Sequence, residues 1–127
     1  MSGILGSVLV TSAGAKVPLI RALAQAALRL DPTAKVVAGD VDEGAASRCV
    51  ADGFWAMPHL DQLDLDAFVA ECQSRNIRTL LPTRDGELGF WAKAAPRLSK
   101  AGIAVITSAP DRLALCLDKL AFAQWGE

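Results

Sequence analysis

The sequence predicts a single α/β domain over its 127 residues. Short apolar runs alternate with segments of helical periodicity, which is the pattern of βαβ units around a parallel sheet buried on both faces. With 52% hydrophobic and 21% charged residues, the composition is that of an ordinary globular protein. We therefore expect a Rossmann-like open sheet of about five parallel strands, with helices on both faces.

The first strand and helix carry the clearest pattern. An apolar run over residues 7–11 predicts a strand, and a small-residue turn leads into a helix from about Lys16 to Leu30. Pro18 falls in the first turn of this helix, where its missing N–H is harmless. The side chains expected to face the sheet are Leu19, Ile20, Leu23, Ala27 and Leu30, and those of the polar side are Arg21, Gln25 and Arg29.

The other elements follow from the same periodicities. Asp31 and Pro32 end the first helix, and Gly102 marks the approach to the last strand. Ser108 is the expected N-cap of the last helix, with Asp111 at the capping-box position. The expected strands are 35–39, 53–57, 79–82 and a fully apolar 103–106; the expected helices are 44–50, 65–75, 88–98 and one running from Pro110 towards Trp125.

Charge and hydropathy exclude two classes of partner. The chain has 13 Lys and Arg against 14 Asp and Glu, and neither sign forms a block suited to nucleic acid or anionic lipid. The N-terminal apolar run is too short to span a bilayer and lacks the features of a signal peptide. We expect no nucleic-acid partner, no membrane partner and a cytoplasmic location.

The metal-binding and redox residue types are sparse. Cys49, Cys72 and Cys116 are odd in number and widely spaced, so we expect reduced, buried thiols. His59 is the only histidine, which excludes a multi-histidine metal site and favours a structural role. The three tryptophans lie near phenylalanines and are interpreted as core or interface residues.

The loops that follow the strands are the expected site, because ligands of open α/β sheets bind outside the carboxyl ends of the strands. The first loop has one glycine, Gly14, where a dinucleotide fold would have three, yet Ser12 and Lys16 could assist an anion at the helix N-terminus. Asp40 or Asp42 could hold a ribose hydroxyl, or form a solvated turn and helix cap.

A polar loop over 83–87 carries two further acids. Asp85 and Glu87 could orient a substrate amine or a metal ion. The alternative is a simple charge pattern at a helix start, which the helix dipole favours. Position at a strand edge slightly favours the functional interpretation.

Several segments together carry a family resemblance. Their order and spacing are more specific than any one of them, and they cover nearly the whole sequence. They are 8–14, 40–43, 51–58, 81–88, and Leu117-Asp118-Lys119 with Phe122. In these segments the chain resembles the pre-ATP-grasp domain, the N-terminal domain of ATP-grasp ligases such as the carbamoyl-phosphate synthase large chain.

The resemblance implies a role for named residues. It implies substrate binding by Ser12, Gly14, Asp85 and Glu87, contact of Lys119 with nucleotide phosphates, and no catalytic or metal-ligating residue in this chain. Residues 108–127 would form the helix that leads into an ATP-grasp domain beyond Glu127. The first turn, Ser-Ala-Gly-Ala, is poorer in glycine than in relatives of this kind.

The resemblance also implies the partners. The full-length protein would use ATP and Mg²⁺ to activate a small carboxylic acid as an acyl phosphate, which an amine then attacks. This chain would bind neither cofactor tightly and would work with an ATP-grasp domain in cis or on a separate subunit. The sequence leaves open a homodimer, an excised fragment, and a stand-alone nucleotide-binding or protein-interaction module.

Overall fold

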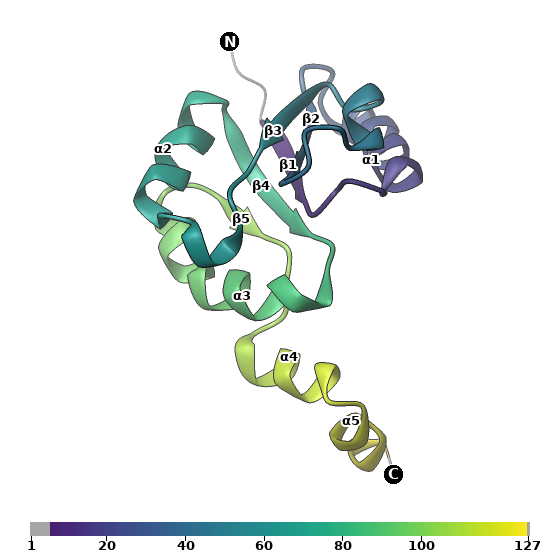
Figure 1. Ribbon diagram of the computed structural model, residues 1–127, viewed down its shortest axis with the longest axis vertical. Coiled ribbons are helices and arrows are strands. Elements are labelled where there is room, and N and C mark those ends of the chain that lie inside the picture. The colour runs from purple at the N-terminus through teal and green to yellow at the C-terminus, as the bar shows by residue number, and fades with distance from the viewer. Residues whose placement is uncertain (1–5, 127) are drawn as a thin grey trace.

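A computed structural model describes residues 6–126, and its centre is one sheet of five parallel strands (Figure 1). The strand order is β3-β2-β1-β4-β5. This confirms the predicted α/β class with an open parallel sheet. The elements are β1 (Ser7–Thr11), α1 (Val17–Leu30), β2 (Val36–Asp40), η1 (Ala46–Cys49), β3 (Gly53–Ala56), η2 (Leu60–Gln62), α2 (Leu65–Ser74), β4 (Ile77–Pro82), α3 (Asp85–Lys100), β5 (Ala104–Val105), α4 (Pro110–Leu117) and α5 (Lys119–Trp125).

Helices cover both faces of the sheet because strand side chains alternate between the two faces. Leu9 joins the core under α2 and α3, whereas its neighbour Val10 joins the core under α1. In β2, Val37 faces the first core and Ala38 the second. The central positions of β1 and β2 are therefore apolar on both faces, which is why the sequence shows them as short apolar runs, whereas β4 also carries the exposed Arg78.

The core between the sheet and the α2–α3 layer is aromatic. Trp55 stacks on Phe68 with ring centroids 5.2 Å apart, and Phe68 lies 5.0 Å from Trp91. Phe68 and Trp91 are fully buried. Trp55 and Trp91 are thus core residues, as predicted, while Trp125 is 67% exposed on α5.

The structure corrects two predicted helices. Helix α3 begins at Asp85, so Asp85 and Glu87 lie in its first turn and not in a loop. The helix dipole favours acidic side chains in a first turn, so these two residues stabilise an earlier start of the helix, closer to the end of the strand. The last helix is two helices, because Asp118 takes an extended conformation and caps α5 by accepting from the Leu120 and Ala121 N–H groups.

Three smaller predictions were also wrong. Ser108 does not cap α4, whose N-cap is Ala109 with no side-chain bond. The fifth strand pairs over two residues at the sheet edge, and Ile106 beyond it is 55% exposed. Leu30, at the last turn of α1, is 79% exposed because the helix end extends past the sheet.

Only one of the cysteines is buried as predicted. Cys72 is buried against the sheet, and desolvation raises the pKa of its thiol to about 12, with a smaller contribution from the charge of Glu71. Cys49 and Cys116 are exposed. All three are free thiols.

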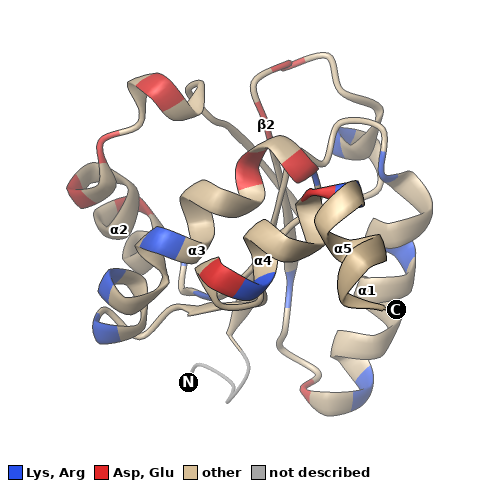
Figure 2. Cartoon of the chain, turned by 90° about the horizontal axis from the view of Figure 1, so that it is seen from below, with Lys and Arg blue, Asp and Glu red and all other residues tan. Residues whose placement is uncertain are grey.

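Helices α4 and α5 extend from the sheet on the side where the strands end (Figure 1). Helix α4 packs on α3, and α5 packs on α4. Most of their surface is uncharged (Figure 2), and the exposed apolar side chains are Leu117, Leu120, Phe122 and Trp125. Elsewhere both signs of charge are scattered over the surface. None of the described helices is long and apolar enough to span a membrane.

Candidate functional site

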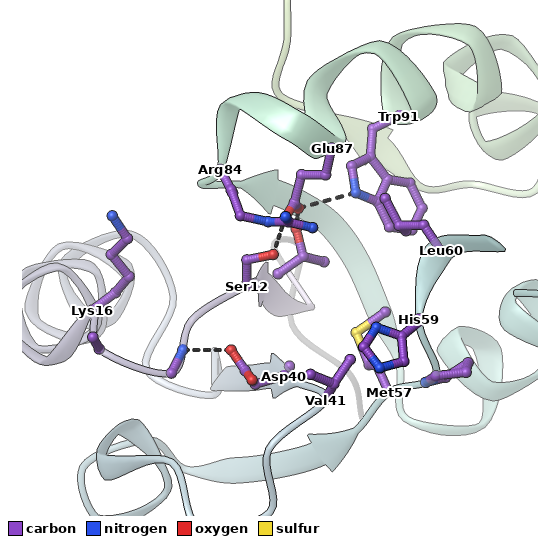
Figure 3. Close-up of a pocket in the computed structure, with 15 residues that line it drawn as sticks. Ser12, Lys16, Asp40, Val41, Met57, His59, Leu60, Arg84, Glu87 and Trp91 are labelled. Carbon is purple, nitrogen blue, oxygen red and sulfur yellow. Dashed lines mark hydrogen bonds and ion pairs between the residues drawn. The ribbon is translucent and has the colours of Figure 1, made fainter. Parts of the chain in front are cut away.

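A pocket of about 320 Å³ opens at the carboxyl ends of the strands (Figure 3). Strand β1 lies between β2 and β4, and the chain crosses to the other half of the sheet after β3, so the pocket is at the topological switch point where α/β sheets bind ligands. Its lining comes from the ends of β1 and β2 and the residues after them, from the segments after β3 and β4, and from helix α3. The lining residues are Thr11, Ser12, Gly14, Ala15, Lys16, Gly39, Asp40, Val41, Met57, Pro58, His59, Leu60, Arg84, Glu87 and Trp91.

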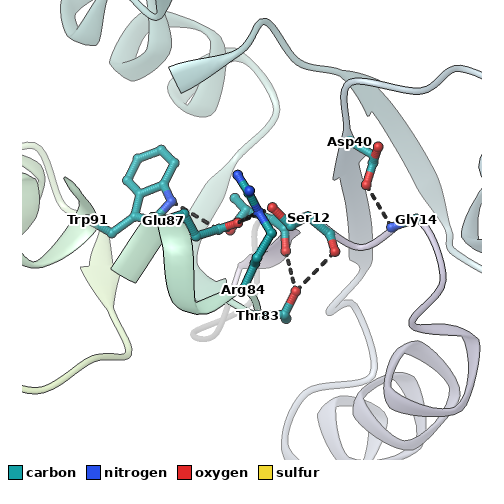
Figure 4. A network of polar contacts seen from close by, with 8 residues as sticks. Ser12, Gly14, Asp40, Thr83, Arg84, Glu87 and Trp91 are labelled. Atoms are coloured by element: carbon teal, nitrogen blue, oxygen red, sulfur yellow. Dashed lines mark hydrogen bonds and ion pairs between the residues drawn. The ribbon is translucent and has the colours of Figure 1, made fainter. Parts of the chain in front are cut away.

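Glu87 is the centre of the polar network in this pocket (Figure 4). Its residue is 1% exposed although it carries a carboxylate. The Thr11 hydroxyl donates to Oε1 and the Ser12 hydroxyl to Oε2. The Trp91 indole Nε1–H also donates to Oε1, at 3.1 Å. A buried carboxylate is tolerated only when it is bonded in this way, so these donors fix where Glu87 lies.

The backbone of the first loop is held by hydrogen bonds from the end of the neighbouring strand, β4. The Thr83 hydroxyl, one residue after β4, donates to the carbonyl oxygens of Thr11 and Ser12 at 2.7 and 3.1 Å. Ser12 has a left-handed φ of 52°, a region that non-glycine residues seldom occupy. The bonds from Thr83 and to Glu87 hold Ser12 in this conformation, which directs its hydroxyl to the buried carboxylate.

Asp40 organises the other half of the pocket floor. Its Oδ2 accepts from the Gly14 N–H at 2.8 Å, and its Oδ1 accepts from the Asp42 N–H at 2.9 Å. A Cβ atom on Gly14 would lie 2.8 Å from Oδ2, so this close approach requires glycine. Both oxygens of Asp40 are engaged by backbone N–H groups, which favours the turn interpretation of this residue over a ribose contact.

Two cations and an imidazole lie in the same pocket. Arg84 is 64% exposed by its side chain, and its Nε is 3.9 Å from Glu87 Oε2. Lys16 precedes α1 and is exposed, as is His59 after β3. Gly39 also lines the pocket, and a Cβ atom on it would lie 2.6 Å from the Met57 sulfur, so this position leaves no room for a side chain.

The structure brings together three of the five residues to which the resemblance gives a role, and also the two loop candidates Lys16 and Asp40. Ser12, Gly14 and Glu87 all line the pocket. Asp85 lies on the same helical turn as Glu87 but is exposed and does not line the pocket. Lys119 is on α5, also outside the lining. Within the part of the chain that the structure describes, no group of three or more His, Cys, Asp or Glu residues could hold a metal ion.

Sequence reasoning missed Trp91, which was interpreted as a core residue. It placed Thr11 and Arg84 among the residues after the strands where a ligand would bind, but gave neither of them a role. The signal for Trp91 was its spacing, four residues after Glu87, which places both side chains on one face of a helix. Recognising it required the earlier start of α3.

Comparisons with known proteins agree with this architecture. A family model described as the PylC-like N-terminal domain matches residues 8–106. The biotin carboxylase subunit of pyruvate carboxylase is 21% identical, with a TM-score of 0.65 over 95% of this chain and 27% of that chain. No curated protein matches the sequence.

Two further solved structures show the same fold. N5-carboxyaminoimidazole synthetase from Staphylococcus aureus, solved with ADP, is 16% identical, with a TM-score of 0.59 over 94% of this chain and 29% of that chain. The corresponding Thermotoga maritima ribonucleotide synthetase is 12% identical, with a TM-score of 0.57 over 94% and 29%. The chain thus spans less than a third of the length of these proteins. Such identities show a shared fold alone.

Proposed function

Because the chain belongs to the family of PylC-like N-terminal domains, we propose that it is the substrate-side domain of an ATP-dependent carboxylate–amine ligase. The resemblance to the N-terminal domains of ATP-grasp ligases, inferred from sequence motifs, is confirmed. The observation that supports the proposal is the pocket at the switch point, formed around the buried Glu87. A built polar network in this position is typical of a ligand site.

The pocket residues supply positioning. The Ser12 hydroxyl is hydrogen-bonded to Glu87, and the Gly14 N–H is hydrogen-bonded to Asp40. Gly14 and Gly39 both line the pocket. Such a preorganised surface holds one end of a small substrate in a fixed place, which is the contribution that proximity makes to a two-substrate reaction. Asp85, outside the pocket lining, would contact substrate only if a neighbouring domain extended the site.

The ATP chemistry belongs to a second domain in this proposal. The structural relatives are proteins more than three times longer than this chain, since it covers 27% and 29% of them. Helices α4 and α5 offer an exposed apolar surface on the side of the sheet where the pocket opens (Figure 1). An ATP-grasp domain that packs on this surface, in cis or as a separate subunit, would lie beside the pocket.

Lys119 fits a role at the boundary between the two domains. It is exposed at the first residue of α5 and forms no ion pair with any other described residue. A lysine is poorly placed at a helix N-terminus unless an anion is near, so a phosphate of ATP held by the second domain would match it. ATP with Mg²⁺ supplies the phosphoryl group that activates the acid. In this proposal the second domain holds ATP and Mg²⁺, so this domain is non-catalytic alone, and we place the protein in the cytoplasm.

ADP release tests the proposal. The chain of residues 1–127 and the full protein with its ATP-grasp domain are each given ATP, Mg²⁺ and a panel of amino acids as acid and amine. We expect no ADP from the chain alone, and ADP that depends on both acid and amine from the full protein. ADP release by the chain alone would refute the non-catalytic assignment. A full protein without acid-dependent ADP release would refute the ligase, and would favour a stand-alone interaction module using the α4–α5 surface.

A further inference from the structure

The two acids of the pocket already accept hydrogen bonds from the protein. Glu87 accepts from Thr11, Ser12 and Trp91, and Asp40 accepts one backbone N–H at each oxygen. A substrate amine that approached Glu87 would have to displace donors that are themselves held in place, at the expense of leaving the Trp91 N–H unpaired in a buried site. Every oxygen of the two acids therefore has a partner within the protein, and neither acid needs a ligand to satisfy it.

The two cations are in the opposite situation. Among the described residues, none accepts a hydrogen bond from the Arg84 guanidinium, and its one ion pair, to Glu87, is long at 3.9 Å. Lys16 forms no ion pair with any residue the structure describes. Both line the pocket, Lys16 just before α1 and Arg84 just before α3 (Figure 3). Their N–H donors are thus available to a ligand.

The neighbouring backbone adds to the positive character of the pocket. The residues of the turn that leads into α1, Gly14 to Lys16, line it, and the first turn of α1 contains no acidic side chain. The positive end of the α1 dipole is therefore uncompensated where it meets the pocket. By contrast, the first turn of α3 carries Asp85 and Glu87.

We propose that the pocket takes an anionic group of the substrate, a carboxylate or a phosphate, between the Arg84 guanidinium and the Lys16 ammonium. The assignment of the ligand as a substrate rests on the proposed function, while the charge preference rests on the pocket alone. Arg84 presents a planar fork of donors that pairs with two oxygens of one group, and Lys16 adds a compact charge. Glu87 then acts as a positioning residue, because it holds Ser12 and lies beside Arg84.

Chemical-shift titration of the isotope-labelled chain tests the charge preference directly. The probes are glutarate, inorganic phosphate and butylammonium, and the signals are the Ser12 and Lys16 amides and the Trp91 indole N–H. We expect saturable shifts of these signals with an anionic probe and none with butylammonium. In the Arg84→Gln variant the affinity should fall about tenfold, as expected for the loss of a bidentate charge-assisted pair.

Arg97→Gln is the matched control. Arg97 lies within α3, pairs with Asp66 at 2.6 Å and does not line the pocket, so its loss should leave anion affinity unchanged. Preferential binding of glutarate identifies a carboxylate as the recognised group, and preferential binding of phosphate identifies a phosphorylated substrate. Shifts with butylammonium alone, no saturable shift with either anion, or an Arg84→Gln variant that binds as well as the parent would overturn the proposal. The ligase assignment is decided separately, by ADP release.

Discussion

Replacing Glu87 by alanine removes the acceptor on which the pocket network depends. The Trp91 indole N–H and the Thr11 hydroxyl then lie in a buried site without the oxygen that they share, while Ser12, which is partly exposed, reaches water. An unsatisfied buried donor costs about 1–3 kcal/mol. Two such donors give an expected loss of about 3 kcal/mol in the free energy of unfolding, after some relief from the carboxylate's own desolvation.

Asp85→Ala is the matched control for this loss. Both acids lie in the first turn of α3, so both variants lose the same favourable interaction with the helix dipole. Only Glu87 is buried and accepts from other elements. Asp85→Ala should therefore unfold close to the parent, and Glu87→Gln, which keeps one acceptor oxygen, should fall between the two.

Urea unfolding followed by far-ultraviolet circular dichroism measures the difference. This signal reports helix content and is insensitive to a change in the surroundings of Trp91. We expect the midpoint to fall for Glu87→Ala with little change in the slope of unfolding free energy against urea, because the surface exposed on unfolding is similar. A difference of less than about 1 kcal/mol between the two alanine variants would show that the network does not stabilise the fold.

Three further outcomes are expected. Gly14→Ala should lower the melting temperature, because the new Cβ would lie 2.8 Å from the Asp40 Oδ2. Gly89→Ala in α3 has open space around it and should raise stability by about 0.5–1 kcal/mol. Calorimetry of the two variants compares them, and equal melting temperatures would contradict the close approach at Gly14. Near pH 8 the folded chain should react with a thiol reagent at Cys49 and Cys116 and not at Cys72, whose pKa is raised to about 12; mass spectrometry of labelled peptides would show this. Because this folded pKa exceeds the unfolded value of 9.0, the contribution of Cys72 to stability is lost as the pH rises above about 9. Lys119→Ala in the full protein should raise the KM for ATP, and steady-state kinetics unchanged by the substitution would refute its contact with nucleotide.

The sheet could be predicted from sequence because its signal is local. Residues 7–11 are a strand as predicted, and β3 differs from its predicted range only by ending at Ala56. Strands buried on both faces are nearly continuous apolar runs, so they stand out against amphipathic helices, whereas Arg78 interrupts the run of β4, whose start at Ile77 lies before its predicted range. The edge strand β5 was overestimated because its register with β4 ends at Val105, although the Ile106 N–H still donates to the Leu80 carbonyl oxygen at 2.9 Å.

The site could be predicted only as far as strand ends are predictable. Ser12, Gly14 and Glu87 follow strands and were found by position, since the carboxyl ends of parallel strands meet at one edge. The partners of Glu87 depend on tertiary structure: nothing local to Thr11 or Trp91 indicates a shared carboxylate 76 residues away from Thr11 and four from Trp91. The break at Asp118 was missed for a similar reason, because a capping aspartate is indistinguishable in sequence from one on a continuous helix surface.

The bonds that Thr83 makes to the Thr11 and Ser12 carbonyls, together with those from these residues to Glu87, stitch the ends of β1 and β4 into a seam. Separating these two strand ends to admit a ligand would break several hydrogen bonds at once. Adjustment to a ligand should therefore fall on the Met57–Leu60 segment after β3, which crosses the pocket without such ties to β1. One wall of the pocket is therefore a fixed template, and we expect substitutions in the opposite wall to change the size of the group that this chain accepts.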